Sequence, residues 1–239
     1  MKLLTVGNTK TVKGEALGYR TFILHLAPSN VSGYNVCPKA SKGCAAACLN
    51  TAGRGRFDNT QNARIRKTRL FFNDRLTFMA MLVKDIQAAI RNAERNNLIP
   101  VFRLNGTSDI RWETVKVGPF ANIMEMFPTR QFYDYTKISN RRNIPANYNL
   151  TFSRSEDNDT ECVTAGILGM NIAVVFNVKK GAPLPATYNI KPDNLVSSDK
   201  QVIDGDESDL RFLDPDGSIV GLRGKGDAKK DSSNFVVDV

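Results

Sequence analysis

The sequence has few histidines, few cysteines and no long apolar run. One histidine, His25, and four cysteines occur in 239 residues. No apolar run reaches the roughly 18 residues of a membrane-spanning helix, and the opening MKLLTVGNTK is too short and too polar for a signal peptide. We therefore expect a cytoplasmic protein without membrane association, whose thiols stay reduced and form no disulfide framework.

The composition is that of an ordinary globular protein. Hydrophobic residues make up 41% of the chain and charged residues 24%, which excludes a disordered or fibrous class. The chain contains no linker, low-complexity tract or internal repeat, and a chain of this length buries a core without covalent staples. We expect one domain over residues 1–239.

Three of the four cysteines are clustered in one short segment, residues 35–57. Cys37, Cys44 and Cys48 have the spacing C-x6-C-x3-C. In a reducing compartment such a cluster indicates metal or redox chemistry, although buried structural cysteines are the alternative. If GCAAACL is helical, Cys44 and Cys48 lie on one helix face, and the alanines between them leave room for a bulky inorganic group.

The spacing of the cysteines leaves the metal open. Zinc needs four ligands, which the three cysteines could complete with His25 or Cys162, but the chain has no close C-x2-C pair. A 4Fe–4S cluster can be held by three thiolates, which leaves one iron open. The position of the segment after the first predicted strand favours the cluster.

Positive charge is concentrated beside the cysteines. The net charge is +9, and residues 39–69 contain eight basic residues against one acidic residue, Asp58. This excess predicts either a solvated helix face or a surface for the phosphates of a nucleic acid or nucleotide. The candidate phosphate-binding residues are Arg54, Arg56, Arg64, Arg66, Lys67 and Arg69.

Apolar runs and helical patterns alternate along the chain. Strands are expected near residues 18–29, 99–106, 130–137, 148–156, 171–178, 200–206 and 218–226, and helices near 59–72, 74–97, 112–126 and 159–169. Such alternation predicts a parallel α/β sheet. We expect a single-domain βα barrel or partial, TIM-like barrel, with the cysteine segment following its first strand.

Polar residues stand at the end of each predicted strand. Carboxyl ends of parallel strands meet at one edge, so these residues predict a shared pocket. We expect catalytic groups and cofactor contacts among Asn105, Asp109, Asp134, Lys137, Ser153, Arg154 and Glu156.

Five runs of residues resemble a known family. NGTSDI, FYDYTK, LTFSRSE, VIDGDESDLRF and GLRGKG are similar to the phage gene-product-88 family, over nearly the whole chain. The resemblance implies a phage-encoded protein in the host cytoplasm and names no reaction.

A more distant resemblance is to radical S-adenosylmethionine enzymes of the spore photoproduct lyase branch. Its matching positions are the three cysteines, residues 105–109, Lys137 and residues 153–156. It implies a 4Fe–4S cluster and S-adenosylmethionine. Within this hypothesis we expect Asp109, Asp134, Lys137 and Glu156 to be catalytic and Asn105, Ser153 and Arg154 to contact the cofactor. The expected substrate is a nucleic acid or nucleotide.

Two other functions compete with this hypothesis. One is a base-exchanging enzyme resembling the tRNA-guanine transglycosylases, with two rim carboxylates as nucleophile and acid/base and with structural zinc. The other is a zinc-stabilised nucleic-acid-binding protein without catalysis. Acidic residues at the strand ends argue against the latter, because carboxylates repel phosphates.

Overall fold

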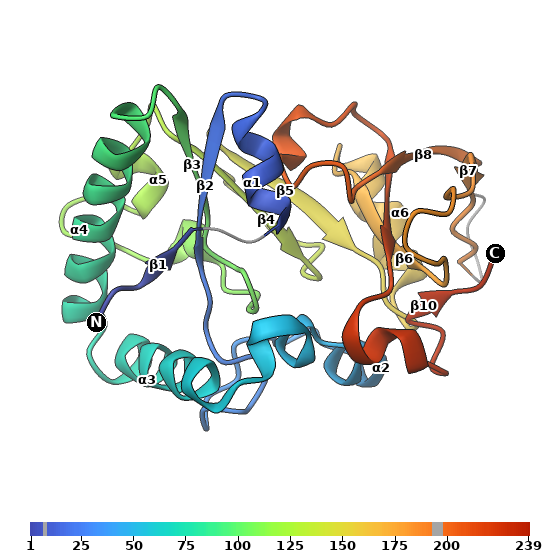
Figure 1. Cartoon of the computed structure of the whole chain (residues 1–239), viewed down its shortest axis with the longest axis horizontal. Helices are drawn as coiled ribbons and strands as arrows, with labels where there is room; N and C mark the ends of the chain where they lie inside the picture. Colours follow the sequence, from blue (N-terminus) through green and yellow to red (C-terminus); the bar gives the residue numbers. More distant parts are fainter. Residues whose placement is uncertain (7–8, 193–197) are drawn as a thin grey trace.

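The computed structural model describes residues 1–6, 9–192 and 198–239. Ten strands form one mostly parallel sheet in the order β1-β2-β3-β4-β5-β6-β9-β8-β7, and β10 pairs with β6 (Figure 1). The strands are β1 (Leu4–Thr5), β2 (Tyr19–Leu24), β3 (Ile99–Arg103), β4 (Gln131–Thr136), β5 (Tyr148–Ser153), β6 (Ile172–Phe176), β7 (Thr187–Tyr188), β8 (Lys200–Asp204), β9 (Ile219–Arg223) and β10 (Val236–Val237).

The parallel α/β architecture predicted from the sequence is confirmed, but the closed barrel is not. Strands β1 and β7 pair antiparallel with β2 and β8 and are the two edges of the strand order that the described residues form. The segment around Leu210 and Phe212 packs on Val101 and Tyr133 and so fills one face of the sheet. That packing occupies space which the inward-facing side chains of a closed barrel would fill.

Helices cover the sheet and one of its ends. They are α1 (Thr9–Glu15), α2 (Lys42–Ala46), α3 (Asp58–Asn73), α4 (Arg75–Glu94), α5 (Ile123–Met126) and α6 (Asp159–Ile167), with short 3-10 turns η1 (Leu49–Thr51), η2 (Gly53–Arg56), η3 (Trp112–Thr114), η4 (Arg211–Leu213) and η5 (Gly226–Lys230). Within the described ranges, no helix has the length and apolarity needed to cross a membrane.

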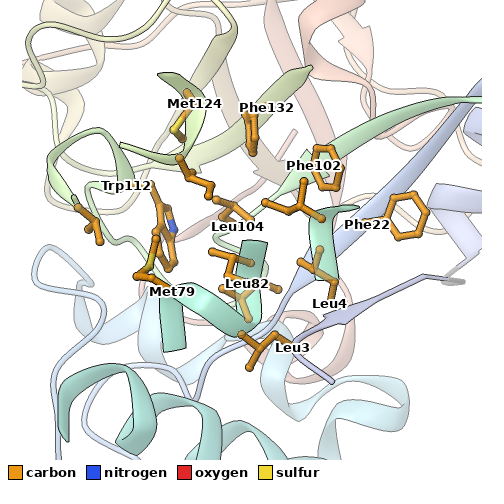
Figure 2. Close-up of a cluster of buried hydrophobic side chains, with 14 of the residues drawn as sticks. Leu3, Leu4, Phe22, Met79, Leu82, Phe102, Leu104, Trp112, Met124 and Phe132 are labelled. Carbon is orange, nitrogen blue, oxygen red and sulfur yellow. The ribbon is translucent and has the colours of Figure 1, made fainter. Parts of the chain in front are cut away.

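The main core lies between the sheet and α4. Figure 2 shows Phe22, Met79, Leu82, Phe102 and Trp112 within one buried cluster. Helix α4 begins where the sequence predicts, because the Asp74 carboxylate accepts a hydrogen bond from the backbone N–H of Thr77 (3.0 Å). Leu76, in the first turn of α4, is exposed to solvent. A second core, between the sheet and α6, contains Phe152 and Cys162.

The prediction of one helix over residues 112–126 is wrong. The segment contains only η3 and α5, with a β-bridge between Val117 and Phe120. Gly118 has a φ of +53° and precedes Pro119, so the backbone turns there and lacks one N–H donor. The apolar spacing that suggested a helix instead places Trp112 and Met124 separately in the core.

Candidate functional site

A cavity of about 480 Å³ lies at the carboxyl ends of the parallel strands. Each of six strands contributes a wall residue at or near its end, namely Ile23, Arg103, Tyr135, Ser153, Val175 and Leu222. The cysteine segment and α3 lie across this end of the sheet (Figure 1). The volume is in the range of small-molecule and cofactor sites, and this edge is where parallel α/β proteins bind ligands.

The three clustered cysteines all line this cavity. Cys37 comes from the loop after β2, Cys44 from α2, and Cys48 from the turn into η1. Helix α2 ends at Ala46, and the Cys48 sulfur accepts from the N–H of Asn50 (3.5 Å) at the start of η1. The prediction that one helix carries Cys44 and Cys48 is therefore wrong, because Cys48 lies beyond the end of α2.

Burial holds two of these thiols in the protonated form. Burial raises the pKa of Cys37, a hydrogen bond from Ser29 opposes this, and negative charge on Cys48, Asp109 or Cys44 adds to it, so that together they raise this pKa to about 11. Burial also raises the pKa of Cys48. A metal that bound these sulfurs would release their protons.

The thiols do not already surround a common point. In the parts of the chain that the structure describes, no three His, Cys, Asp or Glu side chains are placed to hold one metal ion. None of the four cysteines is in a disulfide, and Cys162 lies in the second core on α6.

Glu156 holds the cysteine segment in place. Its two carboxylate oxygens accept hydrogen bonds from the Ser41 hydroxyl and the Gly43 N–H, each at 2.7 Å. The Ser41 hydroxyl accepts in turn from the N–H of Cys44 (3.1 Å). A Cβ at Gly43 would lie 2.8 Å from both Glu156 and Phe235, so the backbone approaches closely there. Glu156, predicted as catalytic, does not line the cavity and orients Cys44.

Asp109 and Lys137 do line the cavity, on neighbouring strand ends. The Asp109 carboxylate accepts from the Thr136 hydroxyl and from the N–H of Lys137, both at 2.8 Å. Burial raises the pKa of Asp109, against these hydrogen bonds and the nearby Arg141 charge. The Lys137 ammonium donates to the Ser153 hydroxyl (2.8 Å), which faces the same space.

Asn105 lines the cavity, but its amide oxygen is used within the turn after β3. It accepts from the Ser108 hydroxyl, the Ile110 N–H and the Trp112 indole N–H, at 2.9 to 3.0 Å. The predicted contact with a cofactor would use the amide N–H₂ group of Asn105. In this structure that group donates to the Ile110 carbonyl.

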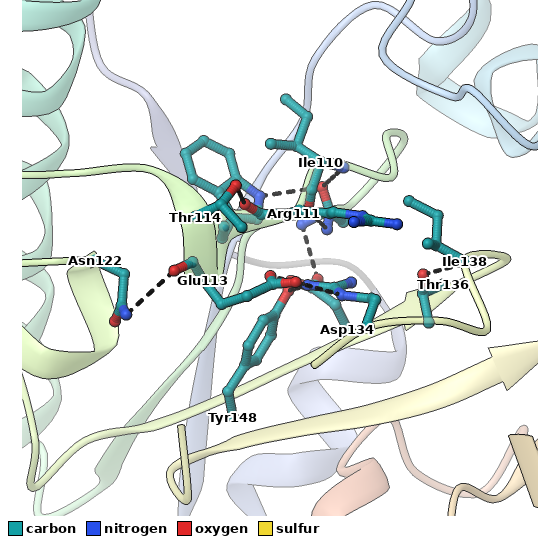
Figure 3. A network of polar contacts seen from close by, with 12 residues as sticks. Ile110, Arg111, Glu113, Thr114, Asn122, Asp134, Thr136, Ile138 and Tyr148 are labelled. Carbon is teal, nitrogen blue, oxygen red and sulfur yellow. Dashed lines mark hydrogen bonds and ion pairs between the residues drawn. The ribbon is translucent and has the colours of Figure 1, made fainter. Parts of the chain in front are cut away.

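Asp134 lies below the cavity and links two strands. Its carboxylate accepts from the N–H groups of Leu104 and Asn105. It also accepts from the hydroxyl of Tyr148 (2.9 Å), which lies beside it in Figure 3. Burial raises the pKa of Asp134 to about 7, against the Arg103 charge and these hydrogen bonds. The residue, predicted as catalytic, is fully buried and does not contact the cavity.

Arg154 also lies outside the cavity. Its guanidinium pairs with Asp159 (2.9 Å) at the first turn of α6 and donates to the carbonyl of Asn234 (2.5 Å). It therefore joins the end of β5 to the C-terminal segment, in place of the predicted cofactor contact.

The six predicted phosphate-binding residues divide into two groups. Arg64 is buried in the cavity wall, and Lys67 is buried with its ammonium on the Leu3 carbonyl (2.7 Å). Burial lowers the pKa of both, that of Lys67 to about 8. The exposed residues are Arg54, Arg56, Arg66 and Arg69.

Sequence reasoning missed Asp209 as a wall residue. It pairs with Arg103 (3.1 Å) although 106 positions separate them, and no local pattern marks such a pair. His25, directly after β2, is neutral in this wall, because burial and the charges of Arg64 and Arg103 together lower its pKa to about 3.

Together these features define an α/β protein with a ligand-sized cavity at the carboxyl ends of its parallel strands. The chain belongs to the Gene product 88 family, whose model matches residues 2–239. The phage gene-product family expected from the sequence is thus confirmed. No curated protein and no solved structure matched the chain, so the comparisons do not support the resemblance to radical S-adenosylmethionine enzymes.

Proposed function

We propose that the protein is an iron–sulfur enzyme that acts on a nucleic acid or nucleotide. The observation that carries this proposal is that Cys37, Cys44 and Cys48 line one cavity at the strand ends. Three thiols are the donor set of a 4Fe–4S cluster that keeps one iron open. Ala40, Ala47 and Ala228 line the cavity too and leave space around the sulfurs.

An open cavity distinguishes this proposal from structural zinc. Structural zinc sites are closed tetrahedra, whereas catalytic centres keep a position open to substrate. Cys37 and Cys48 share the cavity with Asp109, Lys137 and His25, so a group held by the thiols would face polar side chains across an accessible space.

The side chains of the cavity suit S-adenosylmethionine as a second ligand. When bound together, and with one electron delivered to the cluster by an external donor, the two groups would supply reductive cleavage of a sulfonium carbon–sulfur bond, which releases methionine and yields a carbon radical. The Lys137 ammonium can bind a carboxylate, and the Ser153 hydroxyl beside it can hydrogen-bond the same group. Neutral His25 offers a ring nitrogen to a hydroxyl or amine.

The transglycosylase alternative is less favoured because the acids at the rim already have partners. Asp109 is held by Thr136 and Lys137, while Asp204 and Asp206 pair with Arg223 at 2.8 and 3.4 Å. A carboxylate nucleophile needs an oxygen free to attack carbon.

Anaerobic purification tests the proposal. We expect a brown protein containing iron and acid-labile sulfide, and loss of both after Cys37→Ala, Cys44→Ala or Cys48→Ala. The matched control Cys162→Ala should keep its iron, because that thiol lies in the second core. Stoichiometric zinc without iron would favour the zinc alternatives, and metal retained by the triple cysteine variant would reject the site.

A further inference from the structure

The mouth of the cavity adjoins an exposed basic surface. Leu49 in η1 lines the cavity and is 53% exposed, so η1 forms part of an opening. From η1 the chain passes directly into η2, which contacts both η1 and α3. These elements lie along the same end of the molecule (Figure 1).

Four exposed arginines follow this path away from the mouth. Arg54 and Arg56 lie in η2, and Arg66 and Arg69 lie on α3. Arg66 and Arg69 are three residues apart and share one helix face. The exposed residues on either side of them, Asn62 and Asn73, are neutral. Asp58, at the start of α3, is the one acidic residue between Arg54 and Arg69, so positive charge predominates along this face.

The exposed ring of Phe57 stands among the arginines. Phe57, which joins η2 to α3, is 53% exposed and makes no side-chain capping bond to the helix. The ring belongs to none of the hydrophobic clusters that the described residues form. Basic side chains interleaved with exposed aromatic rings are the usual surface for single-stranded nucleic acid, where phosphates meet the cations and unpaired bases stack on the rings. We call residues Arg54, Arg56, Phe57, Arg66 and Arg69 the basic–aromatic surface.

We propose that the basic–aromatic surface binds a single strand of nucleic acid and leads one nucleotide into the cavity. This inference rests on the proposed function for its choice of substrate. A cavity of about 480 Å³ holds one ligand of small-molecule size, so a base must leave its stack to enter it. The surface deepens the proposed function by naming an unpaired strand, not a duplex or a free nucleotide, as the substrate.

Fluorescence anisotropy with labelled oligonucleotides tests the surface. The probes are a single-stranded DNA, an RNA of the same sequence and the matching DNA duplex, each titrated at low and moderate salt. We expect either single strand to bind more tightly than the duplex. Arg66→Glu/Arg69→Glu should weaken binding at least tenfold and flatten the log–log salt slope by about 0.7 for each phosphate that the variant no longer binds.

Phe57→Ala separates stacking from charge. It should weaken single-strand binding about fivefold or more and leave the salt slope unchanged, because the ring carries no charge. The matched control is Lys84→Glu/Arg95→Glu, which makes the same charge change at exposed positions in the middle of α4 and at its C-cap. It should reduce affinity much less than the α3 variant does.

Three results would overturn the inference: no binding at low salt, a duplex bound as tightly as the single strand, or equal losses of affinity in the α3 and α4 variants. Circular dichroism checks that each variant is folded. The test is independent of the metal. Cys44→Ala should still bind the oligonucleotide, and Arg66→Glu/Arg69→Glu should still acquire iron, so failure of the surface and failure of the cluster are distinguishable.

Discussion

Glu156 shows how a single carboxylate can control a thiol it does not touch. Its bonds to Ser41 and Gly43 fix the first turn of α2, and Ser41 fixes the N–H of Cys44. We expect Glu156→Ala to lower the melting temperature and to speed alkylation of Cys44 by iodoacetamide, read by mass spectrometry. Hydrogen bonds to a charged group contribute about 1.5–3 kcal/mol when buried, and less for a half-buried residue such as this one.

Two further variants make the Glu156 experiment specific. Glu156→Gln keeps an oxygen for the Gly43 N–H and should restore part of the protection of Cys44. Glu161→Ala removes an exposed acid from the first turn of α6 and should leave Cys44 unaffected. If Cys44 reacts at the same rate in all three variants, Glu156 does not position the segment.

Asp134 should make stability depend on pH in an unusual direction. Burial raises its pKa to about 7 in the folded protein, whereas an unfolded Asp titrates near pH 4. Between about pH 4 and about pH 7 the folded state binds more protons than the unfolded state, so this residue's contribution to stability falls as the pH rises through that window.

Comparison with Asp134→Asn isolates this residue, since Asn does not titrate. We measure the unfolding free energies of wild type and Asp134→Asn by urea denaturation. The value for wild type minus the value for Asp134→Asn should fall from about pH 4 to about pH 7. If wild type instead gained stability relative to Asp134→Asn over this range, the hydrogen bonds from Leu104, Asn105 and Tyr148 would outweigh desolvation and stabilise the ionised form.

At the scale of elements, long and strongly patterned segments were predictable from the sequence. Helices α3 and α4 and the central parallel strands lie where apolar periodicity and caps place them. Elements that are stabilised by partners distant in sequence could not be predicted. Strands β1, β7 and β10 have two residues each and exist because β2, β8 and β6 offer an edge. Two residues carry no periodicity, so no local pattern marks such strands.

The same limit applies to the candidate site. The rule that polar strand ends converge places Asp109, Lys137 and Ser153 in one cavity. It fails for Asp134 and Arg154, because whether a side chain faces the cavity or a neighbouring strand depends on the register of that strand and on partners far along the chain. The sequence indicates which polar groups lie near the carboxyl ends of the strands. Packing determines which of them face the cavity and can contact a ligand.

Two glycines should respond in opposite ways to a methyl group. A Cβ at Gly106, in the cavity wall after β3, would lie 2.6 Å from Ile23 and 2.8 Å from the Leu24 carbonyl. We expect Gly106→Ala to cost about 1–3 kcal/mol of stability, because backbone on the neighbouring strand cannot yield easily. In α6, a Cβ at Gly166 meets only the flexible end of Lys200, at 3.2 Å.

Gly166→Ala should therefore stabilise the protein by up to about 1 kcal/mol through helix propensity. Thermal denaturation of both variants measures the two effects. Destabilisation of similar size at the two positions would show that the close approach at Gly106 is not what distinguishes them.

On the scale of the whole molecule, one sheet carries two separate cores. Strand β5 contributes Leu150 to the core beneath α4 and Phe152 to the core beneath α6, and Met170 packs against both. The cavity lies at the carboxyl ends of the same strands, so the positions of its wall residues depend on both cores. A sheet hydrogen-bonded without a break from β2 to β9 should transmit the loss of either core to the other.

We therefore predict that the chain unfolds as one cooperative unit. Trp112, the one tryptophan, lies in the first core, and Cys162 lies in the second. Each reports on its own core: Trp112 through fluorescence, and Cys162 through pulsed thiol labelling followed by mass spectrometry. In urea the two transitions should share one midpoint and one slope, as two-state unfolding requires. Labelling of Cys162 at lower urea than the fluorescence change would instead divide the chain into two folding units, with the cavity between them.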